Sequence, residues 1–247
     1  LKTIDLRYNV IGFEGAAAIA EALRGNAVMT ELDVSHNRIG SAGAVAIAKA
    51  LRDNGVLTEL DLGANAIGDE GATALASALE VNEALTSLDV GFNRLTKDSA
   101  LGIVRVEQQR NKLTSLGLSA CSIGPTGATG IAEYVSGSGV LTNLELRNNN
   151  IRDEGAKALA AALRVNAVLT NLDLYRNNIG DEGAKAIGGA LAVNGVLTDL
   201  NLGNNIIRAE GAAAIAEALR GNGVLTELDL SLNYIGGSFN DYIKASE

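Results

Sequence analysis

Hydrophobic residues recur along this chain in a block that repeats every 28 residues. Each block opens with a short alternating stretch, as in LTELDL at residues 57–62, where the last two leucines flank a polar residue. A period of two sends the leucines to one face of a strand and the intervening residues to the other. In the second half of the block, Ala72, Leu75, Ala76 and Leu79 stand at helical spacing. The pattern therefore predicts one strand and one helix in each repeat.

Nine copies of this block follow the template L-x-x-L-x-L-x-x-N closely. Adjacent parallel strands lie ~4.8 Å apart whereas packed helices lie ~10 Å apart, so a stack of such units must curve, with the strands on the inner side. We expect one domain over residues 1–247, in which residues 236–247 form an end segment. The repeats begin at Leu1, Met29, Leu57, Leu85, Leu113, Leu141, Leu169, Leu197 and Leu225.

The strand block is followed by a second motif, N-x-I-G-x-E-G-A-x-A-I/L-A-x-A-L-R, which is nearly intact at residues 9–24, 177–191 and 205–220. Together they resemble the leucine-rich repeats of the ribonuclease-inhibitor-like class, which also occur in NOD-like receptors and Ran GTPase-activating proteins. The resemblance implies an α/β fold: a leucine-rich repeat solenoid shaped as a curved horseshoe of about nine repeats, with a parallel β-sheet on the concave face and α-helices on the convex face. Because the class includes inhibitors, sensors, scaffolds and GTPase activators, it specifies the fold and not the function.

The resemblance also gives the ninth position of the block a structural role, in which an inward asparagine hydrogen-bonds to neighbouring loop backbones. The residues of this ladder are Asn9, Asn37, Asn65, Asn93, Cys121, Asn149, Asn177, Asn205 and Asn233. Cys121 is the only cysteine of the chain, and we expect it to be a buried, unreactive member of the ladder. A catalytic role would need a nearby base, and the only histidine, His36, lies three repeats away, at more than ~14 Å.

Acidic residues dominate the fifth position of the block, which faces the concave side. Neighbouring carboxylates ~5 Å apart repel one another by ~0.8 kcal/mol in water, and a bound cationic side chain would relieve that repulsion. Two other interpretations stay open: solvated residues typical of the class, and a divalent-cation site, which a flat sheet face disfavours because it provides no cage of oxygens. The acidic residues at this position include Asp33, Asp61, Asp89, Glu145 and Asp173, and Gly117 interrupts the row.

The seventh and eighth positions vary most between repeats and bring in arginine and aromatic residues, which are frequent interface anchors. Our main candidate for a partner-binding patch comprises Arg147, Tyr175 and Arg176, with Asp173 and Glu145 beside them. The same arrangement is compatible with a surface salt-bridge network. The remaining candidates on the concave face are Asp33, Asp61, Asp89, Tyr8 and Phe92.

The fourth repeat departs from the helical motif, since Val104, Val106 and Glu107 replace the usual alanine and leucine. Its helix must therefore pack differently, either as drift in a tolerant outer layer or as a bend or contact on the convex side. Pro125 is expected to disturb the start of the next helix. At the ends, residues 238–243 could form a short closing helix, and uncapped ends would allow self-association or indicate a fragment of a longer protein.

Composition narrows the function. The net charge of −9 argues against a nucleic-acid partner, and the absence of a signal peptide or long apolar span, with a single cysteine, favours a cytoplasmic protein without a membrane partner. No nucleophile–base pair, phosphate-binding loop or metal cluster is found, so we expect no enzymatic activity, cofactor or metal. We expect a protein-binding scaffold or ligand-recognition module whose partner has a basic surface. The alternative is a GTPase activator resembling the Ran-directed proteins, which would use a loop arginine such as Arg38, Arg94, Arg152 or Arg208.

Overall fold

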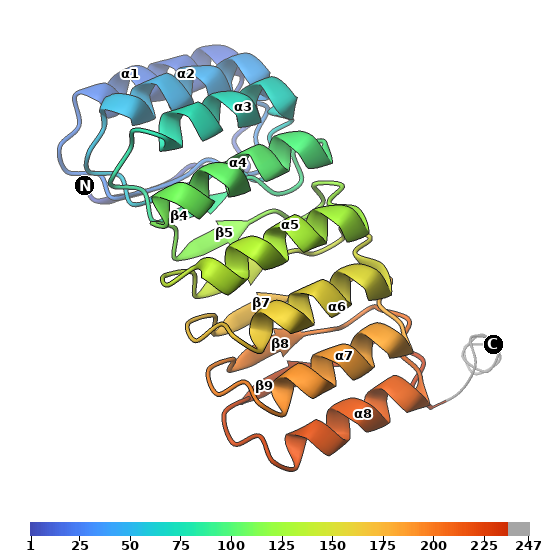
Figure 1. Ribbon diagram of the computed structural model, residues 1–247. Helices are drawn as coiled ribbons and strands as arrows, with labels where there is room; N and C mark the ends of the chain where they lie inside the picture. Colours follow the sequence, from blue (N-terminus) through green and yellow to red (C-terminus); the bar gives the residue numbers. More distant parts are fainter. Residues whose placement is uncertain (237–247) are drawn as a thin grey trace, which may run out of the picture. The chain divides into compact units, whose positions relative to one another are not determined.

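The computed structural model describes residues 1–236 and divides into two compact units, residues 1–122 (unit 1) and residues 123 onward (unit 2). Both units alternate short strands with helices (Figure 1). Unit 1 contains β1 (Thr3–Asp5), α1 (Phe13–Arg24), β2 (Glu31–Asp33), α2 (Gly40–Asp53), β3 (Glu59–Asp61), α3 (Gly68–Leu79), β4 (Ser87–Asp89), α4 (Lys97–Arg110) and β5 (Ser115–Gly117). Unit 2 contains α5 (Gly124–Gly137), β6 (Asn143–Glu145), α6 (Arg152–Leu163), β7 (Asn171–Asp173), α7 (Asp181–Leu191), β8 (Asp199–Asn201), α8 (Ala209–Leu219) and β9 (Glu227–Asp229).

Within each unit the strands pair in parallel and in sequence order, each with the equivalent strand 28 residues later. Leu32 stands opposite Leu60, and Leu60 opposite Leu88, so the leucines of successive repeats form a continuous row. The helices of each unit lie side by side along one side of its strands (Figure 1). This arrangement confirms the predicted α/β leucine-rich repeat solenoid within each unit. The other side of the strands, here called the sheet face, carries the third and fifth positions of each block.

Small residues allow the helices to approach closely. Leu57, Leu60 and Leu62 of the strand block and Leu75 of α3 are at most 2% exposed, so they fill the space between strand and helix. Where neighbouring helices touch, a side-chain Cβ added at Gly71 would lie 2.8 Å from the Cβ of Ala44, which is too close for two carbon atoms. The glycine of the repeated G-A motif is therefore required by helix packing.

Aspartates link the start of one helix to the preceding repeat. The Asp153 carboxylate accepts hydrogen bonds from the backbone N–H groups of Gly180 and Gly183, at 2.7 and 2.9 Å, at the start of α7. Asp181 accepts from the backbone N–H groups of Arg208 and Gly211 at the start of α8, at 2.8 and 2.9 Å. The first N–H groups of a helix have no partner within it, so the starts of α7 and α8 are capped from the preceding repeat.

A second asparagine ladder runs along the ends of the helices. The Asn54 side-chain amide donates to the Leu23 carbonyl of the preceding repeat at 2.8 Å. Its oxygen accepts from the N–H groups of Val56 and Leu57, at 2.9 and 2.8 Å, in the turn that leads into β3. One side chain thereby closes its own turn and joins it to the previous repeat. The ladder comprises Asn26, Asn54, Asn82, Asn166, Asn194 and Asn222.

In the fourth repeat this asparagine is replaced by a buried ion pair. Arg110 occupies the position equivalent to Asn82, and its guanidinium donates to the Asn82 carbonyl at 2.7 Å and to Glu107 at 2.6 Å. The Glu107 carboxylate is fully buried and accepts from the N–H groups of Lys112 and Leu113, at 3.2 and 3.0 Å. The different packing expected for this repeat thus comes from two charged side chains. Arg110 makes the donor bond and Glu107 the acceptor bonds that the side-chain amide of Asn82 makes alone in the third repeat.

The expectation that Pro125 disturbs the next helix is wrong. The helix α5 begins at Gly124 and continues for 14 residues with Pro125 in its first turn. A proline is well tolerated there because the N–H group that it lacks would have no partner within the helix, and its fixed φ suits the helix. The closing helix expected over residues 238–243 lies outside the described residues. No helix within residues 1–236 is long and apolar enough to cross a membrane.

Candidate functional site: the sheet face

Polar side chains from adjacent strands of unit 2 gather on its sheet face. The strand register places Glu145 opposite Asp173, Asp199 opposite Glu227, and Asn201 opposite Asp229. Because the third and fifth residues of every block point to the same side, their carboxylate and amide side chains form two rows with the ~4.8 Å spacing of the strands.

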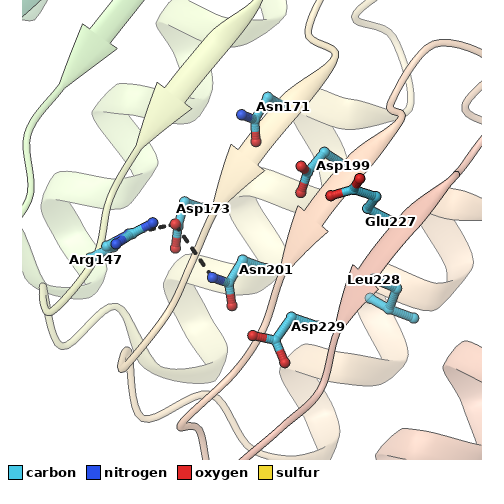
Figure 2. Close-up of a pocket in the computed structure, with 8 residues that line it drawn as sticks. All are labelled: Arg147, Asn171, Asp173, Asp199, Asn201, Glu227, Leu228 and Asp229. Carbon is cyan, nitrogen blue, oxygen red and sulfur yellow. Dashed lines mark hydrogen bonds and ion pairs between the residues drawn. The ribbon is translucent and has the colours of Figure 1, made fainter.

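These residues line a hollow of about 510 Å³ over β7, β8 and β9, here called the acidic hollow (Figure 2). Four carboxylates and a single guanidinium supply its charged groups, so its net charge is strongly negative. Like charges on neighbouring strands repel by ~1 kcal/mol in water, and by more where the groups are partly desolvated. The residues that line it are Arg147, Asn171, Asp173, Asp199, Asn201, Glu227, Leu228 and Asp229.

At one side of the acidic hollow, Arg147 and Asp173 form an ion pair with 2.5 Å between Nε and Oδ2 (Figure 2). The Asp173 side chain is only 8% exposed and also accepts from the N–H group of Tyr175 at 2.9 Å and from the Asn201 amide at 3.4 Å. Partial burial acts to lower the pKa of Arg147, but the hydrogen bond and charge of Asp173 outweigh it, and the net shift is upward. This pair is therefore a fixed wall of the acidic hollow.

The structure brings together only part of the predicted patch of Arg147, Tyr175 and Arg176. The half-buried Tyr175 turns toward the following repeat, where its hydroxyl oxygen accepts from the Asn204 amide at 3.0 Å. A Cβ added at Gly203 would lie 3.1 Å from the Tyr175 ring, so the ring covers this glycine. Arg176 is exposed on the turn after β7, with a left-handed φ of 57°.

The sheet face of unit 1 is acidic as well. Asp33, Asp61 and Asp89 stand opposite one another on β2, β3 and β4, and all three are half-buried. Arg7 pairs with Asp5 at 2.8 Å and with Asp33 at 3.2 Å. The Arg7 side-chain hydrogen bond is the main reason why the pKa of Asp5 is lowered to about 2. Tyr8 and Phe92, the remaining predicted contacts, are 71% and 53% exposed.

The ninth-position residues lie inside the turns that follow the strands. The Asn37 amide donates to the carbonyls of Leu6 and Val34, both at 2.9 Å, and its oxygen accepts from the N–H groups of Asn9 and Ile11, at 2.9 and 2.8 Å. Equivalent bonds are made by Asn65, Asn93, Asn149, Asn177, Asn205 and Asn233.

Cys121 occupies the same place in the fifth repeat. Its Sγ lies 3.9 Å from the Val90 carbonyl and 3.5 Å from the Ser119 carbonyl, which correspond to acceptors of the asparagine amides. The side chain is fully buried, and burial is the main reason why the pKa of the thiol is raised to about 12. No cluster of three or more histidine, cysteine or acidic side chains within residues 1–236 is arranged to hold a metal ion.

A leucine-rich repeat family model matches residues 1–20, 25–48, 53–76, 81–104, 110–132, 140–160, 165–188 and 193–216. The chain belongs to the leucine-rich repeat family. Its 28-residue period fits the ribonuclease-inhibitor-like class, as the sequence indicated. A comparison with curated proteins returned no match.

Solved structures show where this leucine-rich repeat fold also occurs. LegL7 from Legionella pneumophila is 18% identical over 92% of this chain and 82% of its own, with a TM-score of 0.55. The C-terminal domain of tropomodulin from Caenorhabditis elegans is 15% identical over 60% of this chain and 90% of its own, with a TM-score of 0.51. A structure of actin-binding site 2 of leiomodin-1 is 27% identical over 47% of this chain and 69% of its own, with a TM-score of 0.45. The first two likenesses show a shared fold.

Sequence reasoning overlooked three features of this leucine-rich repeat protein. The helix-end asparagines were visible as a second 28-residue recurrence but were not assigned a role. Glu107 stood out as a polar residue in an apolar position, and its partner Arg110 lies three residues later, one helical turn away. The stacked rings of Tyr8 and His36, with centroids 4.3 Å apart, occupy the eighth position of consecutive repeats. The spacing of 28 residues was the signal that could have found this stack.

Proposed function

We propose that this protein is a non-enzymatic protein-binding module whose sheet face receives a basic segment of a partner protein. The observation that carries this proposal is the acidic hollow, in which four carboxylates share one side of three adjacent strands with a single guanidinium. A partner's cationic side chains would relieve the repulsion between these carboxylates. Leucine-rich repeat proteins are generally binding scaffolds, which favours a protein partner over a small substrate.

The relief of repulsion is greatest where the carboxylates lack an internal cation. Arg147 already neutralises Asp173 at one side of the acidic hollow. Asp199, Glu227 and Asp229 lie on β8 and β9, away from that pair (Figure 2). We therefore assign the main binding energy to these three residues. Arg147 then limits how far a basic segment can extend toward β6.

A titration with matched charge variants tests the proposal. An octalysine peptide is titrated into the wild-type protein and into the variant Asp199→Asn/Glu227→Gln/Asp229→Asn, with octaglutamate as the negative probe. A second variant, Glu133→Gln/Glu154→Gln/Glu217→Gln, removes the same charge from exposed positions on the helices of the same unit. We expect the sheet-face variant to bind octalysine at least fivefold more weakly and the helix variant to bind within twofold of wild type. Equal losses in the two variants would mean that net charge alone, and not the acidic hollow, attracts the peptide.

A further inference from the structure

The asparagine ladder at the helix ends contains two kinds of turn. In all six turns the asparagine oxygen accepts from the N–H groups two and three residues later. In three turns the residue after the asparagine is alanine or glutamate, namely Ala27, Glu83 and Ala167. In the other three it is glycine, which gives the pairs Asn54-Gly55, Asn194-Gly195 and Asn222-Gly223. Turns with the same hydrogen bonds therefore differ at the position directly after the asparagine.

The fold does not require glycine in these three turns. A Cβ added at Gly55, Gly195 or Gly223 would have no atom within 4 Å apart from those of its chain neighbours. None of the three is among the described glycines with a positive φ, so a residue with a side chain could adopt the same backbone. Ala27 and Ala167 occupy this position in the first and sixth repeats. The glycines therefore change the chemistry of the turn and not its shape.

An asparagine that precedes glycine reacts readily with its own backbone. The glycine nitrogen attacks the side-chain Cγ, a new C–N bond forms, and the Nδ2 group leaves as ammonia with the proton of the glycine N–H. Water then opens the cyclic imide at one of its two carbonyls. One product has aspartate in place of asparagine, and the other has isoaspartate, in which the main chain runs through the side-chain carboxyl group. Glycine favours the first step because it has no Cβ to crowd the attacking nitrogen.

The folded structure restrains this reaction unequally at the three pairs. Ring closure expels Nδ2, so the hydrogen bonds that this group donates must open first. Asn54 and Asn194 are buried, with 4% and 7% of their surface exposed, whereas Asn222 is half-buried. The Asn222 amide donates to the Leu191 carbonyl at 2.7 Å and to the Asn194 carbonyl at 3.4 Å, and both bonds are partly accessible to water. Local opening costs less where water can replace the broken bonds, so Asn222 is the least protected of the three.

We propose that Asn222-Gly223 is a site of spontaneous modification, at which the folded protein converts asparagine to aspartate and isoaspartate. A carboxylate has no donor, so aspartate at this position would set a negative charge against the Leu191 and Asn194 carbonyls that the amide now bonds. Isoaspartate would lengthen the main chain in the turn that leads into β9. Both products loosen the attachment of the eighth repeat to the seventh, beside a strand that lines the acidic hollow. This inference does not depend on the proposed function.

Peptide mapping by mass spectrometry tests the proposal on folded protein kept at 37 °C and pH 8 and then digested with pepsin in acid. The exchange of an amide NH₂ for OH gives the mass change, and a protein isoaspartyl methyltransferase labels the isoaspartate. We expect Asn222 to react at least about fivefold faster than Asn54 or Asn194, since its bonds open more easily. Gly223→Ala should slow the reaction at Asn222 by at least about tenfold, because the new Cβ crowds the attacking nitrogen. The control Gly221→Ala adds a Cβ in equally open space on the other side of Asn222 and should leave the rate unchanged.

A parallel incubation in 6 M guanidinium chloride calibrates the assay, since all three Asn-Gly pairs should react there at similar rates. Reaction in the denaturant without reaction of Asn222 in the folded protein would overturn the proposal, because it would mean that the folded turn prevents ring closure. Equal rates at Asn222, Asn54 and Asn194 in the folded protein would overturn the choice of the eighth repeat. A rate that Gly223→Ala does not lower would overturn the cyclic mechanism, because hydrolysis of the side-chain amide alone needs no glycine.

Discussion

Glu107 and Arg110 together occupy the place that one asparagine, Asn82, fills in the preceding repeat, and both side chains are at most 5% exposed. The guanidinium supplies the donors and the carboxylate the acceptors that a single amide combines in Asn82. Removing one partner of such a pair leaves an uncompensated buried charge, whereas replacing both partners leaves no buried charge to compensate.

We therefore expect a strongly non-additive pair of substitutions at these positions. Glu107→Gln should lower the free energy of unfolding by about 3–5 kcal/mol, the usual cost of breaking a buried ion pair. Glu107→Leu/Arg110→Asn, which restores the residues of the third repeat, should be close to wild type. Urea denaturation followed by circular dichroism measures both. A double variant as unstable as Glu107→Gln would show that the fourth repeat depends on the charges themselves.

We expect Asn177 to be essential for the stability of the fold, whereas the neighbouring Asn178 should contribute little. Its fully buried side chain bonds to the Leu146 carbonyl and to the N–H groups of Asn149 and Ile151. Asn177→Ala takes away the acceptor of the Asn149 and Ile151 N–H groups and should cost at least about 2 kcal/mol of stability. Asn178→Gly changes an exposed residue and keeps the left-handed backbone accessible, so it should cost less than about 1 kcal/mol. Comparable losses in a denaturant titration would contradict the ladder's role in stability.

Acid should weaken the link between α3 and α4. The hydrogen bond from Ser99, followed by that from the Thr96 N–H group, lowers the pKa of Asp69. Because the folded pKa lies below the unfolded one, the stabilisation is present above about pH 4 and is lost as the pH falls through the folded value. Asp69→Asn, which keeps the shape but not the charge, should be less stable than wild type at pH 7, and the two should converge as the pH falls through the lowered folded pKa of Asp69. Glu70→Gln is the control, and a difference that persists in acid would assign the effect to shape.

Cys121 should react slowly with thiol reagents while the protein is folded. With a pKa of about 12, only about one thiol in ten thousand is ionised at pH 8, and the side chain is fully buried. Absorbance with a disulfide reagent should show little reaction in buffer and one equivalent in 6 M guanidinium chloride. Because the folded pKa is raised, stability should also decline as the pH rises from about 9 toward 12. Rapid native labelling would contradict the buried position.

A GTPase assay distinguishes the binding module from the alternative activator. Arg38, Arg94 and Arg208 lie between a strand and the following helix, whereas Arg152 begins α6 and donates to Asn150 at 3.2 Å. We expect no stimulation of phosphate release from a panel of small GTPases above twofold. A larger stimulation that is lost on changing one of these arginines to alanine would favour the activator.

The fold could be predicted from the sequence because every repeat restates it. The leucines of the strand block and the alanines of the helix recur at 28 residues. An irregular repeat can therefore be assigned its strand and helix by alignment with the regular ones. The site was less predictable because it depends on side-chain directions within the turns. Tyr175 and Arg147 stand at the same repeat position, yet Arg147 pairs with Asp173 whereas Tyr175 covers Gly203. The replacement of an asparagine by Glu107 and Arg110 likewise depends on contacts between repeats, which a pattern within one repeat does not contain.

The sixth and seventh repeats each donate a side chain to the structure of the other: an aspartate caps the next helix, and a ladder asparagine supports the preceding turn. Asp153 of the sixth repeat closes the start of α7, while Asn177 of the seventh closes the turn that follows β6. A cut between the two would thus orphan polar groups on both sides of the break. Shortening or lengthening the protein at this junction should succeed only in whole 28-residue steps that keep an aspartate at the position of Asp153 and an asparagine at that of Asn177. Each of these two repeats supplies a polar side chain on which the other depends, so neither can be removed without leaving backbone groups of its neighbour unpaired.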